Sequence, residues 1–252
     1  MSGGHRHLLV HAEGPLHRLA PQCKVAATVL FVFAVIATPR EAFWAFGCHA
    51  GLVVLVALIG GLPLWSVVKR LVIEVPFLLF AVLLPIVGRA PRIEVLGVSL
   101  SEAGLWAAWN IVVKGSLGVA ATVVLASTTS IPQLLGGLER LRVPRVLVAI
   151  TAFMIRYGDV IGGEVRRMNI ARESRGGSGG RFGQVRALAS TAGALFVRSY
   201  ERGERVYLAM ESRGYTGSMP VRGAPSSARV WLVCLAWPAA AGTVAVLTWA
   251  VT

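Results

Sequence analysis

Five stretches of apolar residues, each close to the length of a membrane-spanning helix, account for most of the sequence. They run over about Gln22–Thr38, Ala42–Leu62, Leu71–Gly88, Ala103–Ser127 and Val230–Val251. A helix crosses the hydrocarbon layer with about 20 apolar residues, and shorter stretches do so by tilting or with help from their flanks. Pro76 and Pro85 predict kinks in the third stretch. The pattern predicts an all-α, polytopic integral membrane protein with about five transmembrane helices.

Residues 128–229 follow a different pattern, because their apolar positions recur at helical spacing instead of forming a continuous run. A short helix is expected over 130–141 and a long amphipathic helix over 144–176. After the break Gly177–Gly180, a second long amphipathic helix is expected to end at Gly214. We therefore divide the chain into a membrane region with four spans, a cytoplasmic helical region and a final span: 1–127, 128–229 and 230–252.

Loop charges fall mainly on one side of the predicted bundle. Basic residues precede the first and third spans, and sixteen Arg lie between the fourth and the fifth. The opposite side holds three Arg against three Glu, namely Arg40, Arg89, Arg92, Glu41, Glu94 and Glu102. Because Lys and Arg are retained on the cytoplasmic side, we expect a cytoplasmic N-terminus and a multi-pass location in the bacterial plasma (inner) membrane.

Composition supports a membrane protein and narrows its chemistry. Of 252 residues, 55% are hydrophobic and 15% are charged, which is too apolar for a soluble domain of this size. Residues 25–38 have the character of a signal-peptide core, but Pro39 and a second apolar run follow directly, so we expect no cleavage. The three cysteines have no metal-ligand spacing and are interpreted as small core residues: Cys23, Cys48 and Cys234.

A six-residue motif occurs twice, 38 positions apart, at the predicted ends of the two long helices. It reads Ala171-Arg172-Glu173-Ser174-Arg175-Gly176 and Ala209-Met210-Glu211-Ser212-Arg213-Gly214. A cation in a last helical turn suits the partial negative charge there, so helix capping is the simplest interpretation of each arginine. Capping does not explain the repetition. We therefore expect two equivalent helix ends that each offer a guanidinium group to a carboxylate on a partner.

With these motifs, the chain resembles the T component, the energy-coupling transmembrane subunit, of energy-coupling-factor (ECF) transporters. The resemblance covers nearly the whole chain and rests on Gly14–Lys24, on Ser130–Leu135 and on the two Arg-Gly ends. In that family the corresponding helices, called coupling helices, end in Ala-Arg-Gly, whereas Ser174 and Ser212 stand in place of the Ala here. The opening segment resembles the cobalt and nickel branch, often called CbiQ.

The resemblance implies a non-catalytic scaffold subunit of an ATP-driven uptake transporter, with cobalt as the expected cargo. It implies that Arg175 and Arg213 seat in grooves of two ABC-type ATPase subunits, which hydrolyse the ATP. It also implies a separate substrate-binding membrane subunit that holds the metal. No cofactor is expected on this chain.

Three polar residues are predicted at membrane depth and are functional candidates for that reason: Glu74, Asn110 and Lys114. Counted from the inner face, Glu74 and Lys114 differ in depth by about 15 Å. We therefore expect no direct pair, with Glu74 snorkelling inward and Lys114 meeting carbonyl groups or a partner helix. No carboxylate cluster accompanies the histidines near the start, so we interpret these as a polar terminus and not as a metal site: His5, His7, His11 and His17.

Two other classes of function stay open. A membrane-tethered protein could use its Arg-rich segment to bind nucleic acid or anionic lipid. The sixteen Arg of 128–229 are interleaved with seven acidic residues and form no continuous basic run, which argues against this alternative. The expected partners therefore include the lipid bilayer but no nucleic acid. A stand-alone ABC permease is the other alternative. An enzyme finds no support, because the sequence lacks a Walker-type loop, a His-Glu-x-x-His zinc pattern and a nucleophile elbow.

Overall fold

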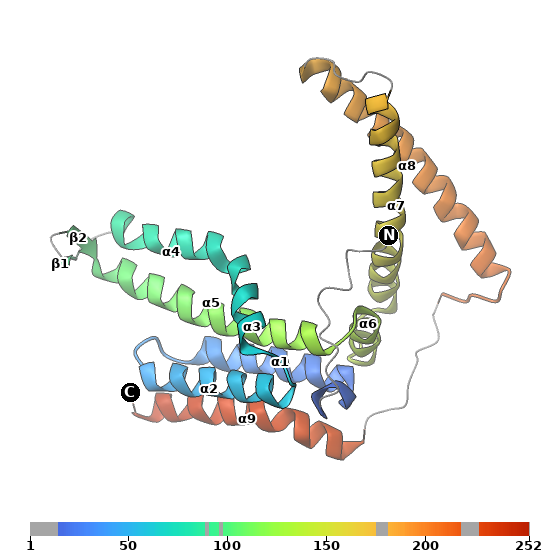
Figure 1. Cartoon of the computed structure of the whole chain (residues 1–252). Coiled ribbons are helices and arrows are strands. Elements are labelled where there is room, and N and C mark those ends of the chain that lie inside the picture. Colours follow the sequence, from blue (N-terminus) through green and yellow to red (C-terminus); the bar gives the residue numbers. More distant parts are fainter. Residues whose placement is uncertain (1–14, 89–90, 96–97, 175–180, 218–226, 252) are drawn as a thin grey trace. The chain divides into compact units, whose positions relative to one another are not determined.

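The computed structural model describes residues 15–88, 91–95, 98–174, 181–217 and 227–251, and almost all of these are helical (Figure 1). The chain divides into two compact units, which are described separately. The membrane unit comprises the described residues up to Leu141 and those from 227 onward. The second unit comprises the described residues from Arg142 to Gly217 and is called the coupling unit after its expected role.

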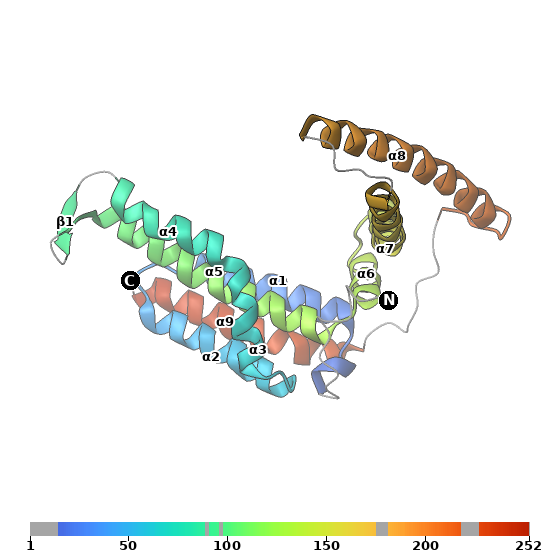
Figure 2. The same cartoon turned by 45° about the horizontal axis from the view of Figure 1, so that its top comes forward.

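The membrane unit contains all of the predicted spans. Its elements, in chain order, are η1 (Pro15–Arg18), α1 (Pro21–Ala37), α2 (Phe43–Ile59), α3 (Leu64–Arg70), η2 (Leu71–Glu74), α4 (Val75–Val87), β1 (Arg92–Val95), β2 (Val98–Ser101), α5 (Glu102–Thr128), α6 (Ile131–Arg140) and α9 (Ala228–Val251). The first and last long helices of the chain lie side by side, since α1 packs on both α9 and α5 (Figures 1 and 2). Helix α2 packs on the same two helices.

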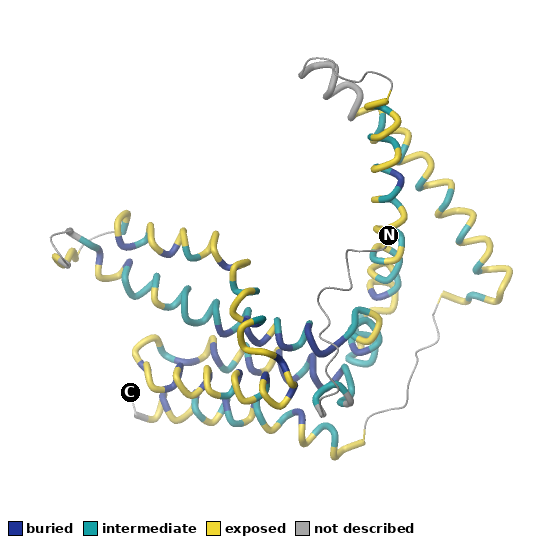
Figure 3. Tube along the Cα trace, viewed as in Figure 1, coloured by how far each residue is buried: buried dark blue, intermediate teal, exposed yellow. Residues whose placement is uncertain are grey.

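The core of the membrane unit lies between α1, α2, α5 and α9, where their buried positions face one another (Figure 3). The aromatic ring of Phe31 on α1 stacks on that of Trp237 on α9, with centroids 4.4 Å apart. Small residues of α5 and α9, such as Ala121 and Ala241, are almost fully buried and let the helices approach closely. Helix α4 packs mainly on α5, and most of its surface is exposed. Such an apolar surface suits a lipid or protein environment and not water.

The third span begins earlier than the apolar pattern predicts. Helical structure starts at Leu64, seven residues before the expected Leu71, and continues through the 3₁₀ segment η2 into α4. Pro76 has no N–H to donate to the carbonyl four residues back, and this loss accounts for a non-α segment at that point. The predicted interruption is therefore a local change in helix type, whereas Pro85 lies inside α4 without ending it.

A small antiparallel hairpin is the one departure from all-helical structure within the described residues. Strands β1 and β2 pair Arg92 with Ser101 and Val95 with Val98. The Ser101 side chain then accepts a hydrogen bond from the Gly104 backbone N–H at 3.2 Å, which caps the start of α5. The hairpin connects the ends of α4 and α5 (Figure 2).

By length and composition, four helical segments among the described residues can cross a membrane: Leu64–Val87, Glu102–Thr128, Arg145–Ser174 and Ala228–Ala250. Three of these are predicted spans. Helices α1 and α2 are apolar but have only 17 residues, or about 25 Å against a hydrocarbon layer of about 30 Å. The remaining segment, α7 (Arg145–Ser174), carries eight charged residues. Its cytoplasmic location stays a prediction.

The cysteine prediction is correct for two of the three residues. Cys23 on α1 and Cys234 on α9 are buried with free thiols, whereas Cys48 on α2 is exposed. Its position on the outward face of α2 explains the difference, because an apolar span has no polar face to reveal its orientation. His49, one residue further on, is fully buried and its Nδ1 contacts the carbonyl oxygen of Ala45.

Two long helices form the coupling unit. They are α7 (Arg145–Ser174) and α8 (Arg181–Glu211), and they pack on each other. Their bounds agree with the predicted helices, and a Gly-rich segment separates them in the sequence. The short helix expected over 130–141 is α6, in the membrane unit, where Arg140 donates a 3.2 Å hydrogen bond to the Gln22 side chain.

Candidate coupling site

The first copy of the repeated motif forms the last turn of α7. Ala171, Glu173 and Ser174 are exposed there, and Arg172 is partly buried. The hydroxyl of Ser174 donates to the Ile170 carbonyl oxygen at 2.6 Å. Arg175 and Gly176 lie outside the described residues, so their predicted role stays a prediction.

The second copy of the motif is described completely and ends α8 in a Schellman motif. Gly214 has a φ of 82°, in the left-handed region that favours glycine. The Gly214 N–H donates to the Glu211 carbonyl oxygen at 2.9 Å. The Tyr215 N–H donates to the Met210 carbonyl oxygen at 3.0 Å. These two hydrogen bonds confirm the prediction that Gly214 ends the helix.

The arginine of this second copy is presented to solvent. Arg213 is exposed, and its side chain has no hydrogen-bond or ion-pair partner among the described residues. An arginine that served only as a cap would be expected to donate to the last carbonyl groups of its helix. Two of those carbonyl groups are already bonded by backbone N–H groups. The guanidinium is therefore available for a partner.

The two serines that replace alanine in the motifs are accommodated in the same way. Ser212 donates its hydroxyl to the Ala209 carbonyl oxygen at 3.1 Å, as Ser174 does to Ile170. Each hydroxyl is thus satisfied within its own helix. The serine in place of alanine therefore does not require a hydrogen bond from a partner at either position. Ala209 and Glu211 are exposed beside Ser212, and Met210 is partly buried.

An ion-pair cluster joins α7 to α8. The Glu164 carboxylate on α7 accepts from Arg198 at 3.2 Å and from Arg202 at 3.3 Å, both on α8. The hydrogen bond from Arg198 holds the pKa of Glu164 below its usual range, with the charge of Arg202 acting in the same direction and partial burial acting against both. A second ion pair, Glu201 with Arg205, lies within α8 at the i, i+4 spacing that suits opposite charges, at 3.8 Å, and is exposed.

Sequence reasoning missed the Glu164 cluster, because helical periodicity describes each helix alone. Beside the cluster, a groove of about 240 Å³ is lined by α7 residues and α8 residues: Phe153, Met154, Tyr157, Ile161, Ser199, Arg202 and Gly203. A charged group between two amphipathic helices is costly unless it is paired. The only charge-based signal in the sequence is the 38-residue spacing between Glu164 and Arg202.

Of the polar residues predicted at membrane depth, Lys114 lies as expected. Its ammonium group donates to the carbonyl oxygens of Ile36 at 2.9 Å and Thr38 at 2.8 Å, at the end of α1. This confirms the expectation that Lys114 meets carbonyl groups. The ammonium also lies 6.0 Å from the centre of the Phe46 ring.

The prediction for Glu74 is wrong. Glu74 does not snorkel inward but is 3% exposed, and it accepts a 2.9 Å hydrogen bond from the Ser116 hydroxyl on α5. A side chain at Gly115 would collide with the Glu74 carboxylate, so glycine provides the space for it. Because Glu74 lies beside the residues that follow Lys114, the estimated difference in depth of about 15 Å is also wrong. The cause is the early start of this helix at Leu64.

Asn110 and the histidines show no assembled ligand site. The Oδ1 atom of Asn110 is buried and has no hydrogen-bond partner among the residues that the structure describes. The same holds for both ring nitrogens of His17, and His5, His7 and His11 lie outside the described residues. Within the described part of the chain, no group of three or more His, Cys, Asp or Glu side chains could hold a metal ion.

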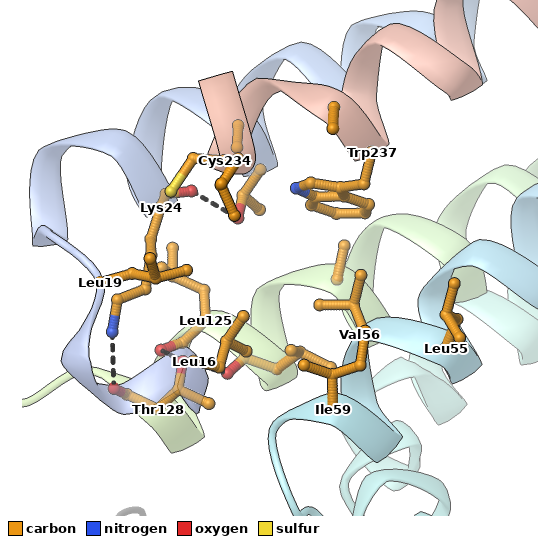
Figure 4. A pocket seen from close by; sticks show the side chains of 16 residues that line it. Leu16, Leu19, Lys24, Leu55, Val56, Ile59, Leu125, Thr128, Cys234 and Trp237 are labelled. Atoms are coloured by element: carbon orange, nitrogen blue, oxygen red, sulfur yellow. Dashed lines mark hydrogen bonds between the residues drawn. The ribbon is translucent and has the colours of Figure 1, made fainter. Parts of the chain in front are cut away.

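The membrane unit also contains an apolar cavity of about 310 Å³ between α1, α2, α5 and α9 (Figure 4). Leu55, Val56 and Ile59 of α2 face Trp237 of α9 across it. At one end, Lys24 donates a 3.0 Å hydrogen bond to the Thr128 carbonyl oxygen, which fastens the start of α1 to the end of α5. This cavity carries none of the residues predicted to couple the protein to a partner.

These features define a multi-pass helical membrane protein with two long helices that pack on each other and carry the same sequence motif at their ends. Comparison with protein families identifies its class: residues 12–223 match the family model of the cobalt transport protein CbiQ. The chain therefore belongs to the CbiQ family. Members of this family are membrane subunits of transporters and not enzymes, which agrees with the prediction from the sequence.

Individual relatives point the same way. The chain is 34% identical to an uncharacterized protein, MJ1089, of Methanocaldococcus jannaschii over 102 residues, or 40% of this chain and 38% of that one. It is 30% identical to the cobalt transport protein CbiQ of Rhodobacter capsulatus over 50% of this chain and 51% of that one. It is 29% identical to the energy-coupling factor transporter transmembrane protein EcfT of Thermanaerovibrio acidaminovorans over 83% and 82%. The chain thus spans about half or less of two of these relatives.

Proposed function

We propose that this chain is the transmembrane subunit of an ECF-type uptake transporter, and that it couples a pair of ABC-type ATPase subunits to a substrate-binding membrane subunit. Arg213, which is exposed and has no side-chain partner within the described part of the chain, lies at the Gly214-capped end of α8 and carries this proposal. The repeated motif extends the same role to Arg175. ATP is hydrolysed by the partner subunits, and this chain holds no cofactor.

In this proposal the two motifs dock into equivalent grooves of the two ATPase subunits. A guanidinium group pairs with a carboxylate through two parallel hydrogen bonds, and its planar geometry makes that contact specific. The region 128–229 then lies in the cytoplasm, as does the N-terminus, and the protein resides in the bacterial plasma membrane. The loop charges support this orientation.

Cobalt is the proposed cargo of the whole transporter. The family description and the relative from Rhodobacter capsulatus both refer to cobalt transport. Within the described part of this chain no cluster of metal ligands occurs, so the substrate-binding subunit is expected to hold the metal. Uptake of radiolabelled cobalt, with nickel as competitor, by cells that carry the complete transporter tests the choice of cargo.

The docking role is tested by co-purification of the neighbouring subunits with wild type, Arg175→Ala, Arg213→Ala and the double variant. Each single variant is expected to reduce the amount of ATPase subunit retained, and the double variant to abolish retention. Arg205→Ala is a matched control, because Arg205 is also exposed on α8 but precedes the motif by four residues. Equal retention and equal ATPase activity in all five preparations would show that the arginines only cap their helices.

A further inference from the structure

Glu164 and Arg202 occupy equivalent positions in the two repeated helices. Glu164 precedes the first motif by seven residues, and Arg202 precedes the second by seven. The residues between keep the same register, because apolar side chains recur at matching positions: Met168 with Val206, and Ile170 with Leu208. The repeat therefore extends from the two motifs back to this pair of opposite charges.

The structure brings these two equivalent positions into contact. Arg202 Nη2 lies 3.3 Å from Glu164 Oε2, and Arg198, one turn earlier on α8, lies 3.2 Å from Glu164 Oε1. The Glu164 side chain is 11% exposed and that of Arg202 is 34% exposed. On α7 the other residues are half-buried or exposed, and Glu164 is one of two buried residues, with Val148. The pair therefore lies at the contact of the two helices and not on their outer surfaces.

Contact between equivalent positions gives the helices two arms of equal length. Ser174 lies ten residues beyond Glu164, and Ser212 lies ten residues beyond Arg202. At 1.5 Å per residue each arm is about 15 Å long. Both arms end in the same sequence, and both terminal serines bond back to their own helix. Equal arms suit two identical or related partners, whose docking sites are related by symmetry.

We propose that the Glu164–Arg202 ion pair is the pivot of the coupling unit, a positioning contact that holds the two motif-bearing ends at equal distances from the helix crossing. This inference rests on the proposed function, in which the ATPase subunits displace the two ends. A fixed crossing transmits that displacement to the opposite halves of α7 and α8. A loose crossing absorbs it, so that ATP hydrolysis continues while transport falls.

An ordinary stabilising salt bridge is the alternative explanation, and the chain offers a matched control for it. Glu201 and Arg205 form an exposed pair within α8 at 3.8 Å, with 54% and 68% of the side chains exposed. Glu201 is adjacent in sequence to Arg202 and carries the same charge as Glu164, but its pair does not join the two helices. Loss of either carboxylate removes one charge, and only loss of Glu164 releases the crossing.

The test measures distances in the purified chain, with its three cysteines replaced by serine, and transport in the full transporter complex. Spin labels are placed at Glu173→Cys and Glu211→Cys, two exposed, equivalent positions inside the motifs, and the labelled chain is measured alone so that docking does not affect the distances. Double electron–electron resonance then gives the distance distribution between the two helix ends. Transport per ATP hydrolysed is measured on full transporter complexes that carry the same variants without labels. The variants are Glu164→Gln, the control Glu201→Gln, and the charge exchange Glu164→Arg with Arg202→Glu, which also carries Arg198→Gln because Arg198 would repel the new arginine.

We expect Glu164→Gln to broaden the distance distribution about twofold and to lower transport per ATP about threefold, since contacting charged residues are strongly coupled. The charge exchange is expected to recover at least half of both changes, and Glu201→Gln to alter neither. An unchanged distribution in Glu164→Gln, or no recovery in the exchange variant, overturns the pivot. The label distances in the purified single chain do not depend on the ATPase subunits. A failure of the proposed docking would appear as full retention of the ATPase subunits by the double variant Arg175→Ala, Arg213→Ala. This outcome is therefore distinguishable from a failure of the pivot.

Discussion

The ammonium group of Lys114, within α5, lies 2.8 Å from the carbonyl oxygen of Thr38, just beyond the end of α1. It also donates to the Ile36 carbonyl oxygen in the last turn of that helix. The final carbonyl groups of a helix have no intrahelical donor and carry partial negative charge. Lys114 therefore satisfies two acceptors that would otherwise be left unpaired at membrane depth, and it fastens α1 to α5.

Replacement of Lys114 by Met is expected to destabilise the membrane unit. Loss of two charge-assisted hydrogen bonds should lower the free energy of unfolding by about 1–3 kcal/mol. Thermal unfolding in detergent, followed by size-exclusion chromatography, measures the effect. Lys69→Met is the control. The Lys69 ammonium lies 5.7 Å from the exposed Trp65 ring, and such an exposed cation–π contact contributes about 1 kcal/mol or less to stability. Equal melting temperatures for Lys114→Met and wild type would contradict this role.

Gly115 is expected to be essential for the position of Glu74. A methyl group at Gly115 would collide with the end of the buried Glu74 side chain, which must shift and give up its hydrogen bond from Ser116, so Gly115→Ala should destabilise the protein by about 1 kcal/mol. Gly118→Ala, one turn further along α5, meets nothing within 4 Å and should be neutral or stabilising by up to about 1 kcal/mol. Thermal unfolding of both variants gives the comparison.

The same prediction has an internal check in a double variant. Glu74→Ala removes the group with which the new methyl would collide. Gly115→Ala should therefore cost less in a Glu74→Ala background than in wild type, because contacting residues are not additive. Additive effects of the two substitutions would show that Gly115 matters for another reason.

The helices themselves could be predicted from the sequence, because each depends on local information. Continuous apolar runs predicted α5 and α9 to within two residues. Gly214 predicted the end of α8, since a left-handed cap is a property of one residue and its immediate neighbours. The arginine of the second motif was correctly placed beside that cap.

Contacts between helices could not be predicted, because periodicity does not show which faces meet. The start of the third span was missed since Lys69 and Arg70 interrupt the apolar run. In the structure, Arg70 donates to the Ser127 hydroxyl and Lys69 lies over Trp65, so both charges are accommodated beside a continuing helix. Glu74 was misplaced as a consequence. The Glu164 cluster was missed for the same reason, as its partners are 34 and 38 residues away.

Substitution of Gly214 by Ala is expected to loosen the end of α8. The φ of 82° costs an L-residue about 1–2 kcal/mol. The amide protons of Gly214 and Tyr215, which close the Schellman motif, should therefore exchange about five- to thirtyfold faster. Gly193→Ala, in the interior of α8 with open space around it, should not affect these amides. Unchanged exchange in Gly214→Ala would show that the cap does not hold this end of the helix.

The contact between α7 and α8 is expected to weaken only under acidic conditions. Arg198 and Arg202 depress the pKa of Glu164, so the folded protein holds this carboxylate ionised at a pH where the unfolded chain, with a Glu pKa of about 4.3, binds a proton. A depressed pKa contributes stability that is present above the unfolded value and is lost as the pH falls through the folded value. The contact should therefore be unchanged from pH 8 to about pH 5 and loosen below about pH 4. Distances between labels at Glu173→Cys and Glu211→Cys, recorded across this range, measure the change. Glu164→Gln should show a pH-independent, broad distribution, and the same acid transition in Glu164→Gln as in the parent chain would assign the titration to another group.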